Sequence, residues 1–318
     1  MTEPVSSSSP LIRDISDTAR WAAWCRAVES ERPDALFNDH LAKRLAGERG
    51  PAIEEAMSKG RGSTVSSLVV RTVSFDKMIL DRISEGGIDT VVNLAAGLDT
   101  RPYRLALPRD FRWIEVDLPN LVSYKESCLA NEPGACRIER VALDLSEAES
   151  RRKLFASIGN ASNGVLVLTE GLLLYLDLAM VTELAIDLAG VPGYQTWLTD
   201  LLHPAMLPFV VRSWNTQEAG SANVPRFAPE GGAEFFQPYG WTLHHWVSAL
   251  EEAERLNRPI TPAGATLTDA QREASRTMNT YVRLDRARTS SRHTDRFRQA
   301  MAGGTILAAP PNQGKGAC

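Results

Sequence analysis

Short apolar runs alternate with segments of helical period through the middle of the chain. The run around Val91, Val92 and Leu94 is β-branched and unbroken, as in parallel strands covered on both faces. We expect strands of this kind near residues 89–94, 111–116, 136–141, 164–169 and 194–201. Helices are expected between them, near residues 101–107, 119–130, 147–158 and 177–190. The alternation predicts an α/β fold with a doubly wound, mostly parallel sheet.

Helical periodicity also marks the region before the first strand. Apolar residues at helical spacing, Trp21 and Trp24 among them, predict a helical stretch over residues 14–47 that Pro33 divides in two. A further helix is expected over residues 64–84. Together these segments predict a helical N-terminal cap ahead of the α/β core.

Periodicity weakens after the fifth predicted strand. Residues 203–240 are rich in Pro, Gly, Phe and Trp, which favours a lid or substrate-pocket insertion. Residues 242–257 are predicted to form a helix, and residues 269 to about 298 a helical region that ends in an arginine cluster. The cluster is typical of a solvated face, and docking of an anionic substrate or partner is the alternative. Residues 303–318 are expected to be loop or disordered extension.

The whole chain is expected to form one domain. Its 318 residues are divided into a cap at 1–85 with a Ser/Pro leader at 1–12, a core at 86–202, a lid at 203–240 and a C-terminal part at 241–318.

Composition and charge narrow the class of protein. With 43% hydrophobic residues in 318, the chain can bury a large core. The formal net charge of −4 argues against a dedicated nucleic-acid binder, because such domains usually carry a basic excess. A small molecule or a peptide is therefore the expected partner, and the oligomeric state stays open.

The sequence also bears on compartment and metal content. The N-terminus lacks the apolar core of a signal peptide, and no run of about 18 apolar residues occurs, so we expect a cytoplasmic protein that does not engage a membrane. Cys25, Cys128, Cys136 and Cys318 lack C-x-x-C spacing. Neither a zinc site nor a disulfide framework is indicated, and no metal is expected.

The first predicted strand runs into a turn suited to a nucleoside. Gly97 lets backbone approach a ligand, and Asp117 follows twenty residues later, at the end of the next strand, where a carboxylate can accept ribose hydroxyls. Ala95 and Thr100 replace the first and last glycines of the dinucleotide pattern G-x-G-x-x-G. The expected ligand is a nucleoside without a pyrophosphate; an ordinary βαβ turn without a ligand is the alternative.

The string VVNLAAGLDTRPYRL at residues 91–105 resembles the signature turn of the leucine carboxyl methyltransferase family, which includes bacterial polyketide and natural-product O-methyltransferases. Further blocks occur in the family's order, at residues 31–37 with Asp39, 71–76, 115–119, 144–145 and 169–176. The resemblance implies an S-adenosylmethionine-dependent enzyme with the class I, Rossmann-like methyltransferase fold. It fades after about residue 200.

The resemblance also implies roles in holding the methyl donor. Arg71 would meet the donor's carboxylate with its planar fork, and Glu170 would face the donor's ammonium. The other expected donor-binding positions are Ala95 and Gly97 in the turn, Asp117 and Leu118 at the ribose, and Asp144 and Leu145 at the adenine. Alternatives are a surface arginine at Arg71, a strand-end cap at Asp117 and a helix N-cap at Asp144.

Methyl transfer from a sulfonium mainly needs alignment and exclusion of water. A carboxylate acceptor is ionised at neutral pH and needs no general base, whereas a phenol benefits from one. His203, just past the fifth predicted strand, is the best-placed candidate base, and Tyr175 is a candidate contact to the acceptor, although each can be structural. We expect an O-methyltransferase that esterifies a carboxylate of a natural product or peptide. The alternatives are a phenol or hydroxyl O-methyltransferase, an NAD-dependent oxidoreductase and a non-catalytic nucleoside-binding relative.

Overall fold

The computed structural model describes residues 15–58, 64–213, 224–261 and 266–287. The predicted leader, the arginines of the cluster beyond Arg286 and the predicted C-terminal extension lie outside these residues.

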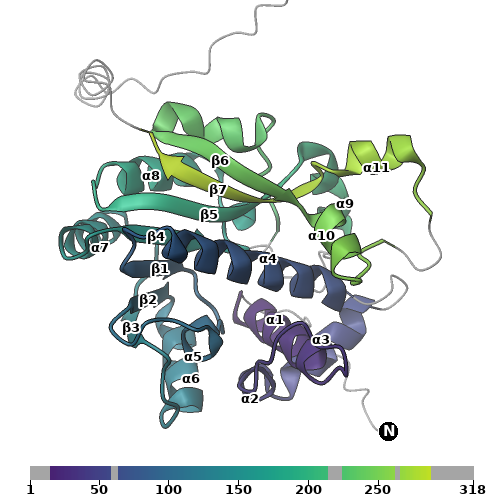
Figure 1. The fold of residues 1–318 in the computed structure, drawn as a ribbon, viewed down its shortest axis with the longest axis horizontal. Helices are drawn as coiled ribbons and strands as arrows, with labels where there is room; N and C mark the ends of the chain where they lie inside the picture. The colour runs from purple at the N-terminus through teal and green to yellow at the C-terminus, as the bar shows by residue number, and fades with distance from the viewer. Residues whose placement is uncertain (1–14, 59–63, 214–223, 262–265, 288–318) are drawn as a thin grey trace, which may run out of the picture. The chain divides into compact units, whose positions relative to one another are not determined.

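Seven strands form one sheet in the order β3-β2-β1-β4-β5-β7-β6 (Figure 1). Neighbouring strands from β3 to β5 pair in parallel, while β7 is antiparallel to both β5 and β6. The strands are β1 Thr90–Leu94, β2 Arg112–Asp117, β3 Arg137–Ala142, β4 Val165–Thr169, β5 Tyr194–Leu202, β6 Trp241–Ser248 and β7 Asn279–Arg286. The predicted mostly parallel sheet is confirmed, and its strand order changes direction between β1 and β4.

Helices cover both faces of the sheet, as the alternation predicts. The helix α4 crosses one face together with α10, while α7 and α8 pack on the other. Their bounds are α4 Val65–Ser84, α7 Ala148–Asn160, α8 Leu178–Ala189 and α10 Ala249–Arg255. The remaining core helices are α5 Arg101–Arg104 and α6 Pro119–Leu129.

The cap consists of α1 Ile15–Ser30, α2 Ala42–Ala46 and α3 Arg49–Ser58. The helix α1 contacts α2, α3 and α4, and apolar side chains of α1, α2 and α6 form a separate cluster that includes Leu98 of the predicted turn. The predicted break at Pro33 is confirmed, because α1 ends at Ser30 and helix resumes only at Ala42.

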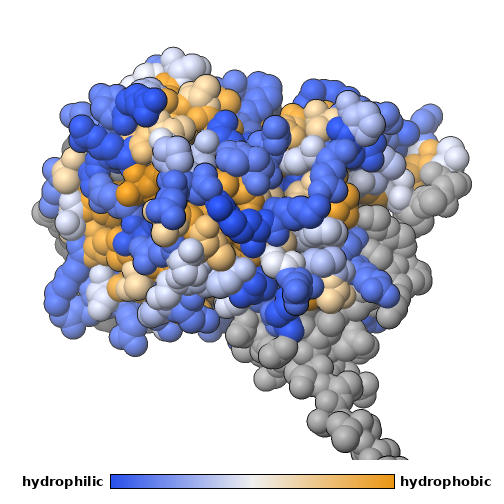
Figure 2. All heavy atoms as spheres, turned by 90° about the horizontal axis from the view of Figure 1, so that it is seen from below, coloured by the Kyte–Doolittle hydropathy of each residue, from blue (hydrophilic) through white to orange (hydrophobic). Residues whose placement is uncertain are grey.

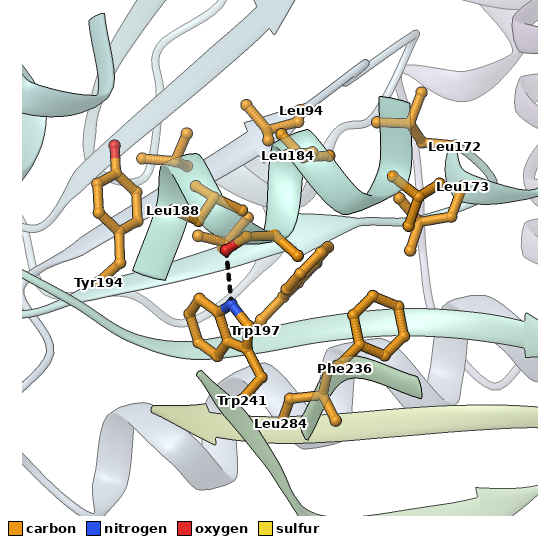
Figure 3. Packing of buried hydrophobic residues seen from close by; sticks show 14 of the residues in the cluster. Leu94, Leu172, Leu173, Leu184, Leu188, Tyr194, Trp197, Phe236, Trp241 and Leu284 are labelled. Carbon is orange, nitrogen blue, oxygen red and sulfur yellow. Dashed lines mark hydrogen bonds between the residues drawn. The ribbon is translucent and has the colours of Figure 1, made fainter. Parts of the chain in front are cut away.

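The apolar core on the α8 face contains three large aromatic side chains. The ring of Trp197 lies with its centroid 5.4 Å from that of Trp241 and 5.1 Å from that of Phe236, both edge to face (Figure 3). Trp241 Nε1 donates to the carbonyl oxygen of Ala185 in α8 at 3.0 Å, so its one polar atom is satisfied. Aromatic pairs of this kind add about 0.5–1.5 kcal/mol beyond area burial.

Two predictions for the C-terminal part are wrong. The segment 242–257 is a strand, β6, followed by α10, whose N-terminus is capped by Ser248. The segment 269–298 begins with the short helix α11 Asp269–Ser275, and Arg283 and Arg286 belong to β7. These segments are strands because β7 pairs with both β5 and β6. The pattern of residues within one segment gives no information about a distant strand that pairs with it, so the prediction from periodicity failed here.

The predicted lid, residues 203–240, is only partly free of the core. Its first half holds η2 Pro204–Met206 and α9 Leu207–Ser213. Its second half contributes Phe227 and Phe236 to the core, the latter from η4 Gly232–Tyr239. The role of residues 203–240 as a lid over a bound acceptor stays a prediction.

Figure 2 shows the face seen from below Figure 1, where hydrophilic residues cover most of the surface and hydrophobic residues lie in small groups between them. None of the described helices combines the length and the apolar run that crossing a bilayer requires.

Candidate functional site

A cavity lies at the carboxyl ends of the central strands, where the strand order changes direction. Its volume is about 970 Å³, including space open to solvent. Its lining comes from the ends of β1, β2 and β4 and from the helices α1 and α4. Ligands of open α/β sheets bind at this switch point.

Asp117 forms the part of the cavity at the end of β2. Its Oδ2 accepts the backbone N–H of Gly97 at 2.6 Å, and its Oδ1 accepts that of Leu118 at 2.7 Å. Burial raises the pKa of Asp117 and outweighs these two hydrogen bonds, which lower it. Each oxygen keeps acceptor capacity beyond its one backbone partner.

The turn after β1 has two residues in the left-handed region. Gly97 has a φ of +52° and Ala95 also has a φ of 52°. For glycine this costs little, whereas for alanine it is strained by about 1–2 kcal/mol. Strained backbone of this kind concentrates at functional sites.

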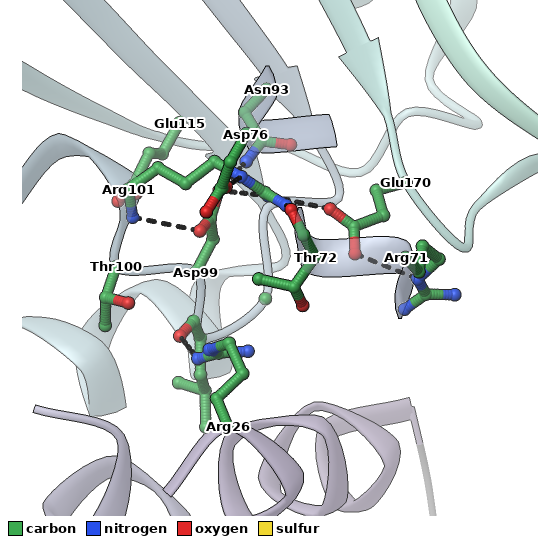
Figure 4. Close-up of polar contacts among 12 residues, drawn as sticks. Arg26, Arg71, Thr72, Asp76, Asn93, Asp99, Thr100, Arg101, Glu115 and Glu170 are labelled. Carbon is green, nitrogen blue, oxygen red and sulfur yellow. Dashed lines mark hydrogen bonds and ion pairs between the residues drawn. The ribbon is translucent and has the colours of Figure 1, made fainter. Parts of the chain in front are cut away.

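A cluster of buried ion pairs forms the opposite end of the cavity. Glu170, which follows β4, pairs with Arg71 of α4 at 2.9 Å and with Arg101 of α5 at 2.7 Å (Figure 4). Arg101 also pairs with Asp99 at 3.1 Å and with Asp76 at 2.7 Å. The carboxylates and guanidinium groups converge from α4, α5 and the strand ends.

The arginines hold these carboxylates in the ionised form. Burial would raise the pKa of Glu170, but the charges of Arg101 and Arg71 outweigh it and lower that pKa. The same balance lowers the pKa of Asp99 to about 2, with Arg101 as its main cationic neighbour. The cluster therefore stays charged at neutral pH.

Asp200 of β5 pairs with Arg71 of the cluster and is not among the residues that line the cavity. Its Oδ1 accepts the backbone N–H of Gly171 at 2.7 Å, and its Oδ2 lies 3.4 Å from Arg71 Nη1. Burial raises the pKa of Asp200, partly offset by Arg71. Gly171 has a φ of +65°, and a Cβ there would lie 3.0 Å from Arg71 Nη1, so this turn needs a glycine.

The structure brings six predicted site residues to the cavity: Arg71, Ala95, Gly97, Asp117, Glu170 and Tyr175. Burial raises the pKa of Tyr175 well above its ordinary value. The prediction assigned Arg71 and Glu170 to separate groups of the donor. In the structure Arg71 and Glu170 also pair with each other. The carboxylate and the ammonium of a bound methyl donor would therefore add to an ion-pair network that already exists.

Four other predicted residues are not among those that line the cavity. Asp144 is exposed and accepts the backbone N–H of Ser146 at 2.9 Å, in the turn before α7. The N-cap of α7 is Glu147, so Asp144 is not the helix N-cap of the alternative either. The carbonyl oxygen of Leu145 accepts from Arg151 at 2.7 Å, and the N–H of Leu118 is donated to Asp117.

His203, the candidate base, is the fourth of these residues. Its Nδ1 accepts the backbone N–H of Ala205 at 3.1 Å and so caps η2. This hydrogen bond orients the imidazole along the backbone of η2. The role of His203 as a base stays a prediction.

Sequence reasoning missed several residues at the cavity. Arg101 and Asp99 lie inside the quoted signature string but received no role, because their ion pairs depend on Asp76 and Glu170 elsewhere in the chain. Trp21 was assigned only to a packing face of a helix, yet it lines the cavity. The sequence carried no local signal for these contacts.

The sheet order and the cavity at its switch point define the class I methyltransferase architecture. Two solved structures share this fold: a candidate methyltransferase from Thermobifida fusca YX has a TM-score of 0.57 at 15% identity, with 87% of this chain and 96% of that chain covered. A duf574 family protein from Streptomyces avermitilis has a TM-score of 0.54 at 15% identity, with 85% and 97% covered.

The leucine carboxyl methyltransferase family model matches residues 19–188. A candidate S-adenosyl-L-methionine-dependent methyltransferase of Parafrankia sp. is 34% identical over 278 residues, which cover 81% of this chain and 87% of that protein. One of Streptomyces coelicolor is 36% identical over 167 residues, 50% of this chain and 59% of that protein. The chain belongs to the leucine carboxyl methyltransferase family and is an S-adenosylmethionine-dependent methyltransferase.

Proposed function

We propose that this methyltransferase transfers the methyl group of S-adenosylmethionine to a carboxylate oxygen of a small molecule or peptide and so forms a methyl ester. A carboxylate of a natural product is the acceptor class that we favour. One observation carries the proposal: none of the described residues that line the cavity is a histidine, and burial raises the pKa of Tyr175, its tyrosine, away from that of a useful base. An acceptor that is already ionised needs no base.

The donor fits the residues of the cavity. Asp117 is a buried carboxylate with acceptor capacity to spare, which suits the two hydroxyls of a ribose. Arg71 and Arg101 offer guanidinium donors to a carboxylate, and Glu170 and Asp99 offer charge to an ammonium. We assign these residues to the donor's ribose and methionine ends.

When bound, the donor would supply an electrophilic methyl carbon on a sulfonium sulfur, and the neutral thioether would be its leaving group. The residues of the chain therefore act by binding and orientation rather than by moving a proton. We assign Asp117 and the Glu170 cluster to the two ends of the site. Asp117 is buried, and Glu170 is held by its ion pairs with Arg71 and Arg101. An ionised carboxylate acceptor aligned with that methyl carbon would need no proton removed, so its methyl ester could form without a base.

The remaining wall of the cavity suits an acceptor with an apolar body. It is formed by side chains of α1, α4 and the η1 region: Trp21, Leu68, Leu172, Leu174 and Tyr175. The indole of Trp21 is held by a hydrogen bond from Nε1 to Glu54 Oε2 at 2.6 Å, and Glu54 also accepts from Thr64 at 2.8 Å. A fixed aromatic ring offers rigid contact area to an apolar ligand.

Matched pairs of acceptors test this function. Aromatic and aliphatic carboxylic acids are incubated with methyl-labelled S-adenosylmethionine beside the corresponding phenols and alcohols. We expect label to enter the acids and to be released as methanol by mild alkali, which cleaves a methyl ester. An alkali-stable product from the phenols, with none from the acids, would overturn the carboxylate assignment and leave the methyltransferase class intact.

A further inference from the structure

A buried polar network ties the helical cap to the turn after β1. We call it the cap latch and define it as Arg26, Asp39 and Thr100. Arg26 Nε donates to Asp39 Oδ2 at 2.8 Å, and Thr100 Oγ1 donates to the same oxygen at 2.5 Å. Arg26 Nη2 also donates to the carbonyl oxygen of Leu98 at 2.6 Å. Figure 4 shows Arg26 reaching from the cap helix toward the turn that carries Asp99 and Thr100.

The latch touches the turn on both sides of Asp99. Leu98 follows Gly97, whose N–H binds Asp117, and Thr100 precedes Arg101 of the ion-pair cluster. Thr100 is fully buried and is not among the cavity-lining residues, so it has no surface to offer a ligand. Its hydroxyl can influence the donor site through the backbone of the turn or through Asp39 and Arg26, the latter of which lines the cavity.

The latch is built from groups that are costly to bury. The carboxylate side chain of Asp39 is 1% exposed, and its Oδ1 has no partner among the described residues. Burial would raise the pKa of Asp39, but Arg26 and Thr100 outweigh it, so the group is held ionised. A buried ion pair adds little net stability over apolar residues of the same volume, whereas it can select one arrangement of the chain.

We propose that the cap latch sets the conformation of the turn at residues 97–100, and that Arg26, Asp39 and Thr100 are positioning residues for donor binding. The inference rests on the donor placement proposed above and adds a role for the cap. The cap is then part of the donor site's scaffold as well as its cover.

The chain offers a matched control in the same helix. Glu29 pairs with Arg258 at 2.7 Å, and their side chains are 1% and 4% exposed, close to the 1% and 10% of Asp39 and Arg26. This second pair ties α1 to the segment after α10 and does not contact the turn. Loss of the Glu29–Arg258 ion pair should lower the stability of the protein about as much as loss of the Arg26–Asp39 pair, without changing the conformation of the turn.

The test measures binding of S-adenosylhomocysteine by calorimetry, together with the melting temperature of each variant. Thr100→Val removes the hydroxyl that donates to Asp39, and Asp39→Asn removes the charge that pairs with Arg26. Each variant is expected to bind S-adenosylhomocysteine about 10-fold more weakly than the wild type. Thr100→Ser keeps the hydroxyl and should restore affinity to within about twofold. Glu29→Gln should lower the melting temperature comparably while its affinity stays within about twofold.

Two results would overturn the positioning role: near-normal affinity in folded Thr100→Val, or an equal loss of affinity in Glu29→Gln. Should Asp39→Asn fail to fold, Thr100→Val decides alone, because it removes one hydroxyl and keeps the side-chain shape. If the wild-type chain does not bind S-adenosylhomocysteine, both the proposed donor placement and the positioning role of the cap latch are contradicted. The acceptor plays no part in this measurement, so a wrong carboxylate assignment leaves its result unchanged.

Discussion

The two walls of the cavity are built from opposite chemistry. The wall at the strand ends is charged and its groups are already paired, as with Glu170 between Arg71 and Arg101. The other wall is formed by apolar side chains such as Trp21 of α1, Leu68 of α4 and Leu174 of η1. In the placement that we propose, the charged wall holds the donor's ribose, carboxylate and ammonium, whereas the apolar wall offers the acceptor only an apolar surface. The proposal therefore defines the donor more narrowly than the acceptor.

Of the substitutions in the charged wall, Asp117→Ala should cause the largest loss of affinity for the methyl donor. Asp117→Ala is expected to weaken S-adenosylhomocysteine binding about 10- to 100-fold, because charge-assisted hydrogen bonds contribute about 1.5–3 kcal/mol. Calorimetric titration, with and without a chelator, measures the loss and shows whether a metal contributes. Glu139→Ala is the control, since Glu139 pairs with Arg112 on the exposed side of neighbouring strands. Equal affinity in both variants would show that the ribose site is misplaced.

The charged wall should also be sensitive to acid. The pKa of Asp99 is lowered to about 2 from 3.8, so its ionised form contributes stability above about pH 4 that is lost as pH falls toward 2. The difference in free energy of unfolding between wild type and Asp99→Asn should shrink by about 2 kcal/mol over this range. Urea unfolding at several pH values measures it. A difference that does not change with pH would mean that Asp99 is not ionised preferentially in the folded chain.

On the apolar wall, Trp21→Ala should affect the acceptor and spare the donor. Loss of the ring is expected to raise the KM of an apolar carboxylic acid about 10-fold, because aromatic side chains contribute much of the contact energy with an apolar ligand. The affinity for S-adenosylhomocysteine should stay within about threefold of the wild-type value. Trp246→Ala serves as the comparison, because Trp246 lies on β6 and is not among the cavity-lining residues. An equal loss of donor and acceptor binding in Trp21→Ala would remove the distinction between the walls.

The same contrast explains what could be predicted from the sequence. The charged wall is built on strand ends and tight turns. Local patterns predicted Gly97, Asp117 and the five parallel strands of the core, and the family resemblance added Glu170. Four of these strands follow from apolar runs, because β1 and β4 are buried along their whole length and β2 and β5 along most of it. The fifth, β3, has no buried residue and follows from its place in the strand–helix alternation.

The apolar wall and the cap could not be predicted in this way. Trp21 reaches the cavity only because α1 packs beside α4, and Arg101 finds Glu170 across 69 positions of the chain. The strands β6 and β7 were predicted as helix, since their conformation depends on pairing with β5. Each of these features depends on a partner that is distant in sequence.

His203→Ala should have the smallest effect on turnover. His203 caps η2 and is not among the cavity-lining residues, so turnover with a carboxylic acid is expected to stay within about threefold of wild type. Initial rates at saturating donor and acceptor check this. A loss of about 10²- to 10⁴-fold would instead indicate a general base and a protonated acceptor.

The pH dependence of the methyl-transfer step tests the central claim most directly. Single-turnover rates with a carboxylic acid acceptor, measured from about pH 6 to pH 9, should be nearly constant, because a carboxylate is fully ionised throughout and no residue of the cavity has to take a proton. A rate that climbs through this range with the pKa of a histidine or a phenol would contradict the account.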